Sequence, residues 1–251
     1  MVGAAIQPEF DFRHALQREL GRLLAPLWVP WVVLYLWSVK RYRIEGVQES
    51  RRAFARFRRE NDAPILLCAN HLTLIDSMLV ALALAPAWRL TFFFGWMPWN
   101  TPERTNFAAG MGMRFLIYLA KCIPITRGGR REDVATTLNR VSRLTRNGEL
   151  ALVFPEGGRS RTGRVDVEAA AWGVGRVVGS IPDCRVVCVY LRGRVQETWS
   201  DIPATGESFD VEVACIEPKS DSRGARRSRD LARQVVSQLV RMEERCLDGR
   251  Q

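Results

Sequence analysis

The chain has few of the residues that build metal centres. Its 251 residues include only two histidines, and its six cysteines form no C-x2-C pair. Structural zinc sites usually take closely spaced cysteine and histidine ligands. We therefore expect no metal site in this protein.

Several patterns of nucleotide, nucleic-acid and hydrolase chemistry are also missing. The sequence has no G-x4-G-K-[ST] phosphate loop, no G-x-S-x-G nucleophile turn, and no zinc-finger, aromatic RNA-binding or basic-zipper pattern. A Walker nucleotide site and a serine-hydrolase elbow are therefore unsupported. We also expect no nucleic-acid partner.

Positive charge and apolar residues are what the chain does contain. The formal net charge is +10, and 47% of the residues are hydrophobic, enough for a substantial core. An excess of basic residues favours an anionic partner, here a membrane surface or a phosphorylated ligand. Most of the cysteines lie inside apolar runs, which predicts buried free thiols in a reducing compartment. They are Cys68, Cys122, Cys184, Cys188, Cys215 and Cys246.

An apolar stretch over residues 23–39 divides the chain into an N-terminal arm, residues 1–40, and a main domain, residues 41–251. The stretch is rich in tryptophan, contains Pro26 and Pro30, and is followed by basic residues from Lys40 onward. It is somewhat short for a spanning helix, which needs about 20 apolar residues. We expect an interfacial or re-entrant membrane anchor, the alternative being an amphipathic helix that covers the core of the main domain. A signal peptide is not expected, because acidic residues precede the stretch and no small-residue cleavage site follows it.

The main domain alternates between short apolar runs and amphipathic segments. This alternation predicts an α/β fold with a mostly parallel sheet flanked by helices. The expected strands cover residues 42–47, 64–69, 89–95, 121–126, 149–154, 185–191 and 209–216. The expected helices cover residues 48–60, 78–84, 107–120, 131–147, 167–178 and 228–246, and residues 96–106 are expected to form a loop.

One stretch, APILLCANHLTLIDS over residues 63–77, combines a strand, a histidine and a carboxylate. The apolar run ends in Asn70 and His71, and Asp76 follows five residues later at the start of the next helix. Imidazole can accept a proton near neutral pH, and a nearby carboxylate can fix its tautomer. The spacing alone is a weak signal, because many histidines have an aspartate five residues later. The position at the end of an apolar strand is what makes His71 and Asp76 a candidate catalytic pair.

Polar clusters also follow other expected strands. FPEGGRSRTG follows the strand over residues 149–154, with Glu156, Gly157, Gly158, Arg159 and Ser160, while Arg127 and Arg192 follow two further strands. Glycines let backbone N–H groups approach an anion, and arginines clamp phosphate. The alternative is a surface turn with solvated charges. Since parallel sheets bind ligands beyond the carboxyl ends of their strands, these clusters predict one shared site.

Four motifs in this order resemble those of the glycerolipid acyltransferase superfamily, over roughly residues 41–191. The first is Asn70-His71-Leu72-Thr73-Leu74-Ile75-Asp76-Ser77, the second is Ile123-Pro124-Ile125-Thr126-Arg127, the third is Phe154-Pro155-Glu156-Gly157-Gly158-Arg159-Ser160, and the fourth is Val186-Val187-Cys188-Val189-Tyr190.

The resemblance implies a membrane-associated enzyme that transfers a fatty acyl group from acyl-CoA or acyl carrier protein to a lysophospholipid, with no other cofactor. It implies His71 as general base and Asp76 as the group that orients it. Asn70, Arg127, Glu156, Gly157, Gly158, Arg159 and Ser160 would bind substrate. The expected location is the cytoplasmic face of the cell (inner) membrane, with peripheral or monotopic attachment.

The chain departs from the family pattern where the acceptor is concerned. Thr126 stands where many members have an acidic residue, Gly158 replaces the commoner threonine, and Cys188 replaces a proline. Lysophosphatidate is the first expectation for the acceptor. Glycerol 3-phosphate, or a non-phosphate acceptor such as an amino-acid lipid, a polyene or a glycolipid, stays open. Two further alternatives are a hydrolase and a non-catalytic protein that binds membranes.

Overall fold

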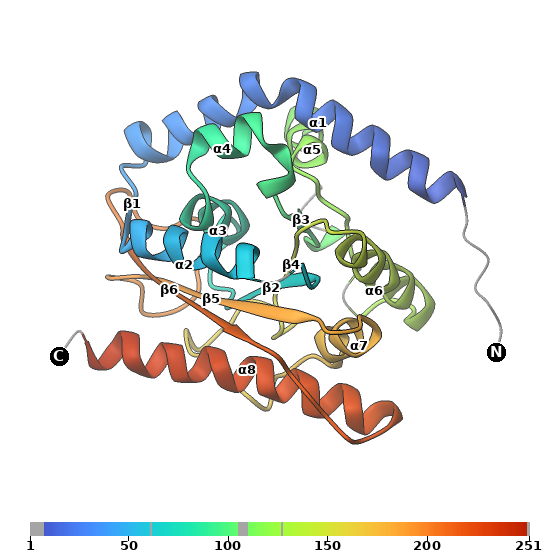
Figure 1. Ribbon diagram of the computed structural model, residues 1–251. Coiled ribbons are helices and arrows are strands. Elements are labelled where there is room, and N and C mark those ends of the chain that lie inside the picture. Colours follow the sequence, from blue (N-terminus) through green and yellow to red (C-terminus); the bar gives the residue numbers. More distant parts are fainter. Residues whose placement is uncertain (1–7, 61, 105–109, 127, 250–251) are drawn as a thin grey trace.

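A six-stranded sheet forms the centre of the protein, and helices cover both of its faces (Figure 1). The computed structural model describes residues 8–60, 62–104, 110–126 and 128–249. In these ranges the strands are β1 (Arg43–Glu45), β2 (Ile65–Ala69), β3 (Trp99–Asn100), β4 (Ala151–Val153), β5 (Arg185–Gly193) and β6 (Ser208–Ile216). The helices are α1 (Pro8–Leu34), α2 (Val47–Glu60), α3 (Asp76–Leu84), α4 (Ala87–Phe92), α5 (Met111–Leu119), α6 (Arg131–Arg146), α7 (Trp172–Ser180) and α8 (Gly224–Asp248), with a π-helical turn over Tyr35–Val39 and a 3-10 turn over Phe94–Trp96.

The strand order is β1-β6-β5-β2-β4-β3, and only the β5–β6 pairing is antiparallel. The central strand β2 pairs in parallel with β5, from Ile65 opposite Arg185 to Ala69 opposite Val189, and with β4 on its other side. The expectation of a mostly parallel α/β fold is confirmed. Because β2, β4 and β5 run in the same direction, the segments that follow them emerge at the same edge of the sheet.

Alternation along β2 explains the two layers on the sheet. Leu66 and Cys68 belong to the core beneath α7 and α8, whereas Leu67 and Ala69 belong to the core beneath α2 and α3. Successive side chains of a strand point to opposite faces, so a continuous apolar run such as ILLCA needs cover on both. All five residues of β2 are buried.

The N-terminal helix α1 adds a further layer outside α3. It lies against α4 and α5 on the side of the sheet away from α8 (Figure 1). Ala25, Trp28 and Val29 of α1 are buried against Leu79 and Leu90, which lie in α3 and α4. The helix runs through both of its prolines. By length and composition alone, the segment Phe12–Val39 is long and apolar enough to cross a membrane. An 18-residue window within it has a mean hydropathy of 1.4, and 28% of that window is buried. The division of the chain at residue 40 stays a prediction.

The predicted strand over residues 89–95 is wrong. The segment instead forms the end of α4 and the 3-10 turn that follows it. Leu90 and Phe94 lie four residues apart, both are buried, and the ring of Phe94 packs edge-on against Trp28 of α1 at 6.4 Å between centroids. Packing against α1 therefore overrides the strand preference of this aromatic run.

The predicted strand over residues 121–126 is also wrong. Only two isolated bridges form, between Asn100 and Cys122 and between Glu103 and Ile125. Lys121 adopts a positive φ of 55°, and Pro124 has no N–H to donate to a ladder. The expected loop over residues 96–106 contributes the short strand β3 beside this segment. The other expected elements are present, although α7 begins five residues later than expected. Residues 107–109, the expected start of the helix that contains α5, lie outside the described residues.

Candidate active site

His71 lies in the loop that joins β2 to α3, two residues beyond the end of the strand. Asn70 fixes the start of this loop, because its side-chain amide donates to the carbonyl of Leu191 at 2.9 Å and accepts from the N–H of Leu191 at 2.8 Å. These two bonds hold the end of β2 against β5. Asn70 was expected to bind substrate, and in the structure its buried amide holds backbone in place.

The predicted pair of His71 and Asp76 is in direct contact. Nδ1 of His71 lies 3.0 Å from Oδ2 of Asp76, and both residues are buried. The carboxylate also accepts the N–H groups of Leu72 at 2.6 Å and Thr73 at 2.7 Å, and the hydroxyl of Thr73 at 2.5 Å. An ionised carboxylate only accepts hydrogen bonds, so this contact makes Nδ1 the protonated nitrogen and leaves Nε2 to accept a proton.

The loop after β4 packs against His71 from the other side. The ring of Phe154 stacks on the imidazole with centroids 4.0 Å apart and planes 17° apart, and the N–H of Ser160 donates to the carbonyl of His71 at 2.8 Å. The first and third motifs therefore lie together although 83 residues separate His71 from Phe154, as expected for segments that follow neighbouring parallel strands.

Glu156 in this loop is a half-buried carboxyl group. The Ser160 hydroxyl donates to its Oε2, while Oε1 is buried with no hydrogen-bond partner within the described residues. Burial raises the pKa of Glu156 from 4.5 to about 7, more than the bonds from Ser160 and the backbone of His71 lower it. Glu156 can therefore carry a proton near neutral pH.

The glycines of the loop shape its backbone. Gly157 has a φ of 68°, and a Cβ there would lie 3.2 Å from the Cβ of Ala171. A residue with a side chain would be strained at this position. Gly158 is half-buried beside it.

Arg159 is the predicted phosphate clamp, and it already has protein partners. Its guanidinium forms an ion pair with Asp201, lies 3.4 Å from the carbonyl of Ser200, and stacks on the ring of Trp199 at 4.4 Å. Arg192 is buried and donates to backbone carbonyls of the same segment, those of Gln196 at 2.9 Å and Glu197 at 3.0 Å. Arg192 therefore shapes the loop after β5. Arg127 lies outside the described residues.

Sequence reasoning missed three contributors to this site. Thr73 binds the Asp76 carboxylate twice, Phe154 stacks on His71, and Asp201 pairs with Arg159. The hydroxyl residue two places after the histidine was a local signal for Thr73. Asp201 had none, because 42 residues separate it from Arg159.

An apolar groove begins at the loop that carries the pair. Leu74, Ile75 and Met78 line one end, and side chains of α1 and α5, including Trp31 and Met113, line the rest of a volume of about 780 Å³. Nearly all of its lining is apolar. The groove can take a long hydrocarbon chain with its head next to the histidine loop.

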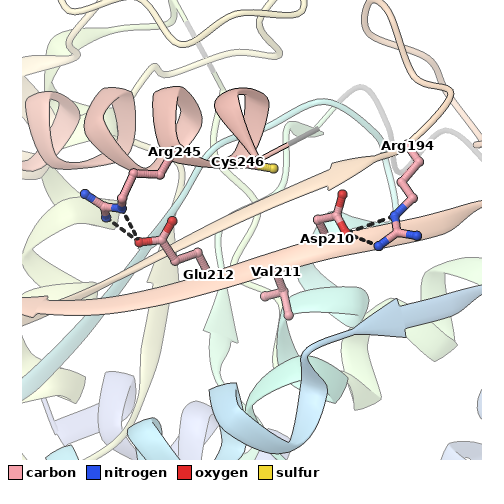
Figure 2. Close-up of a pocket in the computed structure, with 7 residues that line it drawn as sticks. Arg194, Asp210, Val211, Glu212, Arg245 and Cys246 are labelled. Atoms are coloured by element: carbon pink, nitrogen blue, oxygen red, sulfur yellow. Dashed lines mark hydrogen bonds and ion pairs between the residues drawn. The ribbon is translucent and has the colours of Figure 1, made fainter. Parts of the chain in front are cut away.

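A second hollow of about 690 Å³ lies between β6 and the end of α8, away from these residues. Figure 2 shows Arg194 directed to Asp210 at 2.9 Å and Arg245 directed to Glu212. Carboxylates already neutralise both arginines. None of the predicted site residues lines this hollow.

Comparison with known proteins identifies the family. The family model described as Acyltransferase matches residues 41–192, more than half of the chain and including both the histidine loop and the third motif. No curated protein matches the chain. The protein is therefore an acyltransferase and belongs to the glycerolipid acyltransferase superfamily.

Proposed function

We propose that this enzyme moves a fatty acyl group from the thioester of acyl-CoA or acyl carrier protein to the free hydroxyl of a lysophospholipid. The first candidate for this acceptor is lysophosphatidate. The observation that carries the proposal is that the loop holding the His71–Asp76 pair also lines the apolar groove, through Leu74 and Ile75. A base beside a chain-sized apolar groove suits an acyl donor whose reactive carbonyl lies at the head of a long hydrocarbon chain.

His71 acts as the general base in this proposal. Its Nε2 takes the proton of the acceptor hydroxyl as the oxygen attacks the thioester carbonyl, and the Asp76 carboxylate stabilises the imidazolium that forms. Collapse of the tetrahedral intermediate breaks the C–S bond, and the imidazolium returns its proton to the leaving thiolate. The new ester and the free thiol leave the site, so the enzyme is unchanged.

The acceptor phosphate is assigned to the loop after β4. Arg159 supplies a fixed positive charge there, and the positive φ of Gly157 sets the backbone of the loop beside it. Asp201, the present partner of Arg159, is largely exposed, so an arriving phosphate can take its place. Glu156 and Ser160 form hydrogen bonds with the hydroxyl groups of the same acceptor. Arg127 is kept as a further phosphate ligand on sequence grounds alone.

A non-phosphate acceptor is the second candidate, and the Arg159–Asp201 pair is the observation that favours it. An arginine that stays paired with carboxylate offers little to a phosphate. Glycerol 3-phosphate stays as a smaller phosphorylated alternative.

The proposed site of action is the cytoplasmic face of the cell (inner) membrane, with the protein attached peripherally or monotopically. Exposed apolar side chains of α1, such as Leu23, Leu27 and Trp31, support this attachment. Basic residues follow the helix from Lys40 onward and suit anionic lipid on the cytoplasmic side.

The test is thiol release from long-chain acyl-CoA and from acyl carrier protein by the detergent-solubilised full chain. Parallel reactions contain lysophosphatidate, glycerol 3-phosphate, a neutral monoacyl lipid, or no acceptor. Release that requires lysophosphatidate supports the proposal. Release that requires the neutral lipid would replace the phosphorylated acceptor with the second candidate, and equal release without acceptor would show a hydrolase.

A further inference from the structure

A pocket of about 520 Å³ lies between α2 and α4 and gathers positive charge. Its charged lining consists of Arg58, Arg59 and Arg89, and its aromatic lining consists of Trp88, Phe93 and Trp96. Arg58 also lines a small hollow with Pro64 and Ile65, where β2 begins, and the carboxylates of Asp62 and Glu149 line that hollow too. His71 follows the other end of β2, so this pocket is separate from the candidate active site.

Two of these arginines, Arg58 and Arg89, stack on one aromatic ring and form no ion pair within the described residues. The guanidinium carbons of Arg58 and Arg89 lie 4.2 Å and 4.6 Å from the centroid of the same Trp96 ring. Over the described ranges of the chain, neither residue forms an ion pair, and Nη1 of Arg58 is buried without a hydrogen-bond partner. Burial and, to a smaller extent, the nearby charge of Arg89 both lower the pKa of Arg58.

This arrangement contrasts with the hollow of Figure 2, where each arginine faces a carboxylate. Arg58 and Arg89 both line this pocket and are each held by stacking on Trp96, so both can donate N–H groups to one anion that enters it. The planar fork of N–H donors on a guanidinium group matches the oxygens of a phosphate group. A phosphate in the pocket would neutralise the paired charges and satisfy the buried donor of Arg58.

Exposed aromatic residues at the rim indicate where that phosphate comes from. The exposed fractions are 52% for Trp88, 70% for Phe92 and 58% for Phe93. Trp88 and Phe92 lie on α4, which packs along α1 (Figure 1), and Phe93 directly follows that helix. Aromatic side chains next to arginines are typical of the lipid headgroup boundary. The aromatic rim would enter the lipid surface while the arginines meet the headgroups.

We propose that Arg58 and Arg89, stacked on Trp96, form a binding site for the phosphate headgroup of an anionic membrane phospholipid that is not the substrate. The inference of this site depends on one part of the proposed function, namely that the protein works at a membrane. With α1, it gives the enzyme a second contact with the bilayer and so fixes its orientation there.

The test is flotation of the full chain with vesicles of phosphatidylcholine alone or mixed with phosphatidylglycerol. The double variant R58Q/R89Q is compared with R226Q/R227Q, which removes the same charge from exposed positions on α8. We expect the wild type and the α8 control to prefer the anionic vesicles equally. R58Q/R89Q should lose roughly 10- to 30-fold in affinity for them, at about 1 kcal/mol for each arginine near the surface.

A third variant, R58K/R89K, keeps both charges and should fall between the wild type and the glutamine variant, because lysine cannot form the planar fork. Equal binding of R58Q/R89Q and wild type to anionic vesicles would overturn the proposal. So would tight binding of inorganic phosphate, followed by tryptophan fluorescence without vesicles, since it would indicate a soluble ligand. Acyl transfer by the same preparations in detergent reports separately on the proposed reaction.

Discussion

The catalytic assignment depends on one carboxylate, that of Asp76. Asp76 accepts four hydrogen bonds, and only one of them comes from His71. The other three come from the loop itself, so the carboxylate holds both the loop and the imidazole. Orientation of the base is therefore built into the segment of six residues that carries it.

Replacement of Asp76 by asparagine should keep the shape of the side chain and remove its charge. The amide can present its N–H₂ group to Nδ1 and so favour the wrong tautomer of His71. We expect kcat/KM for acyl transfer to fall about 10²- to 10⁴-fold. D248N, an exposed aspartate at the end of α8, is the matched control and should keep wild-type activity. An active D76N enzyme would remove the orienting role.

Glu156 should make the stability of the fold depend on pH. Its pKa of about 7 lies above the unfolded value of 4.5, so the native state binds more protons between these values. The free energy of unfolding should therefore fall as pH rises from about 5 to 8. The unfolding free energy of E156Q should not show this dependence. Relative to wild type, it should rise by roughly 1–3 kcal/mol between about pH 5 and pH 8. Denaturant unfolding at both pH values measures the difference, and a constant difference would show that Glu156 ionises normally.

Lys121 and Glu149 join several elements through a buried ion pair. Nζ of Lys121 lies 2.8 Å from Glu149, which also binds Arg18 of α1 at 2.8 Å and the indole N–H of Trp99 in β3 at 3.1 Å. Burial alone would raise the pKa of Glu149. Lys121, Arg18 and the hydrogen bond from Trp99 together outweigh burial and leave that pKa lowered. The pair therefore connects α1 to the sheet.

E149Q should leave the Lys121 charge buried without its partner. Breaking a buried pair on one side costs about 3–5 kcal/mol of unfolding free energy, whereas removing both charges costs much less. The double variant K121M/E149Q should therefore recover most of the loss. Thermal or denaturant unfolding provides the comparison. If the double variant is as unstable as E149Q, lost packing rather than uncompensated charge is the cause.

The groove between α1 and α5 should limit the length of the acyl chain. Gly112 lines it, and a Cβ added there would contact nothing within 4 Å. G112F should fill the groove without disturbing the fold, and so reduce kcat/KM for long-chain thioesters at least tenfold more than for short-chain ones. G95F, at an equally open position outside the groove, is the control. An unchanged preference for chain length would exclude the groove as the acyl site.

Local patterns were predictable from the sequence, and long-range partners were not. The strand before His71 and the start of α3 follow from apolar runs and their ends, so the His71–Asp76 contact could be predicted. The helix α4 could not, because Leu90 and Phe94 turn inward only when α1 lies over them. The same holds for Arg159, whose partner Asp201 comes from a distant loop.

The whole molecule has two sides with different roles. The sheet and the helices α7 and α8 form one large core, and α1, α4 and α5 form a second layer that carries many of the exposed apolar residues (Figure 1). The groove opens in this second layer, next to the histidine loop. In the proposed membrane-attached state, this arrangement would let a lipid substrate reach the proposed base without crossing water.

The role of His71 is tested most directly by acyl transfer with H71A beside the wild type. The reaction is measured as thiol release from long-chain acyl-CoA in the presence of the preferred acceptor. Equal unfolding free energies of the two proteins would show that the variant is folded. Loss of the base should lower turnover at least 100-fold. A variant that keeps more than a tenth of wild-type turnover would contradict the central claim that His71 is the catalytic base.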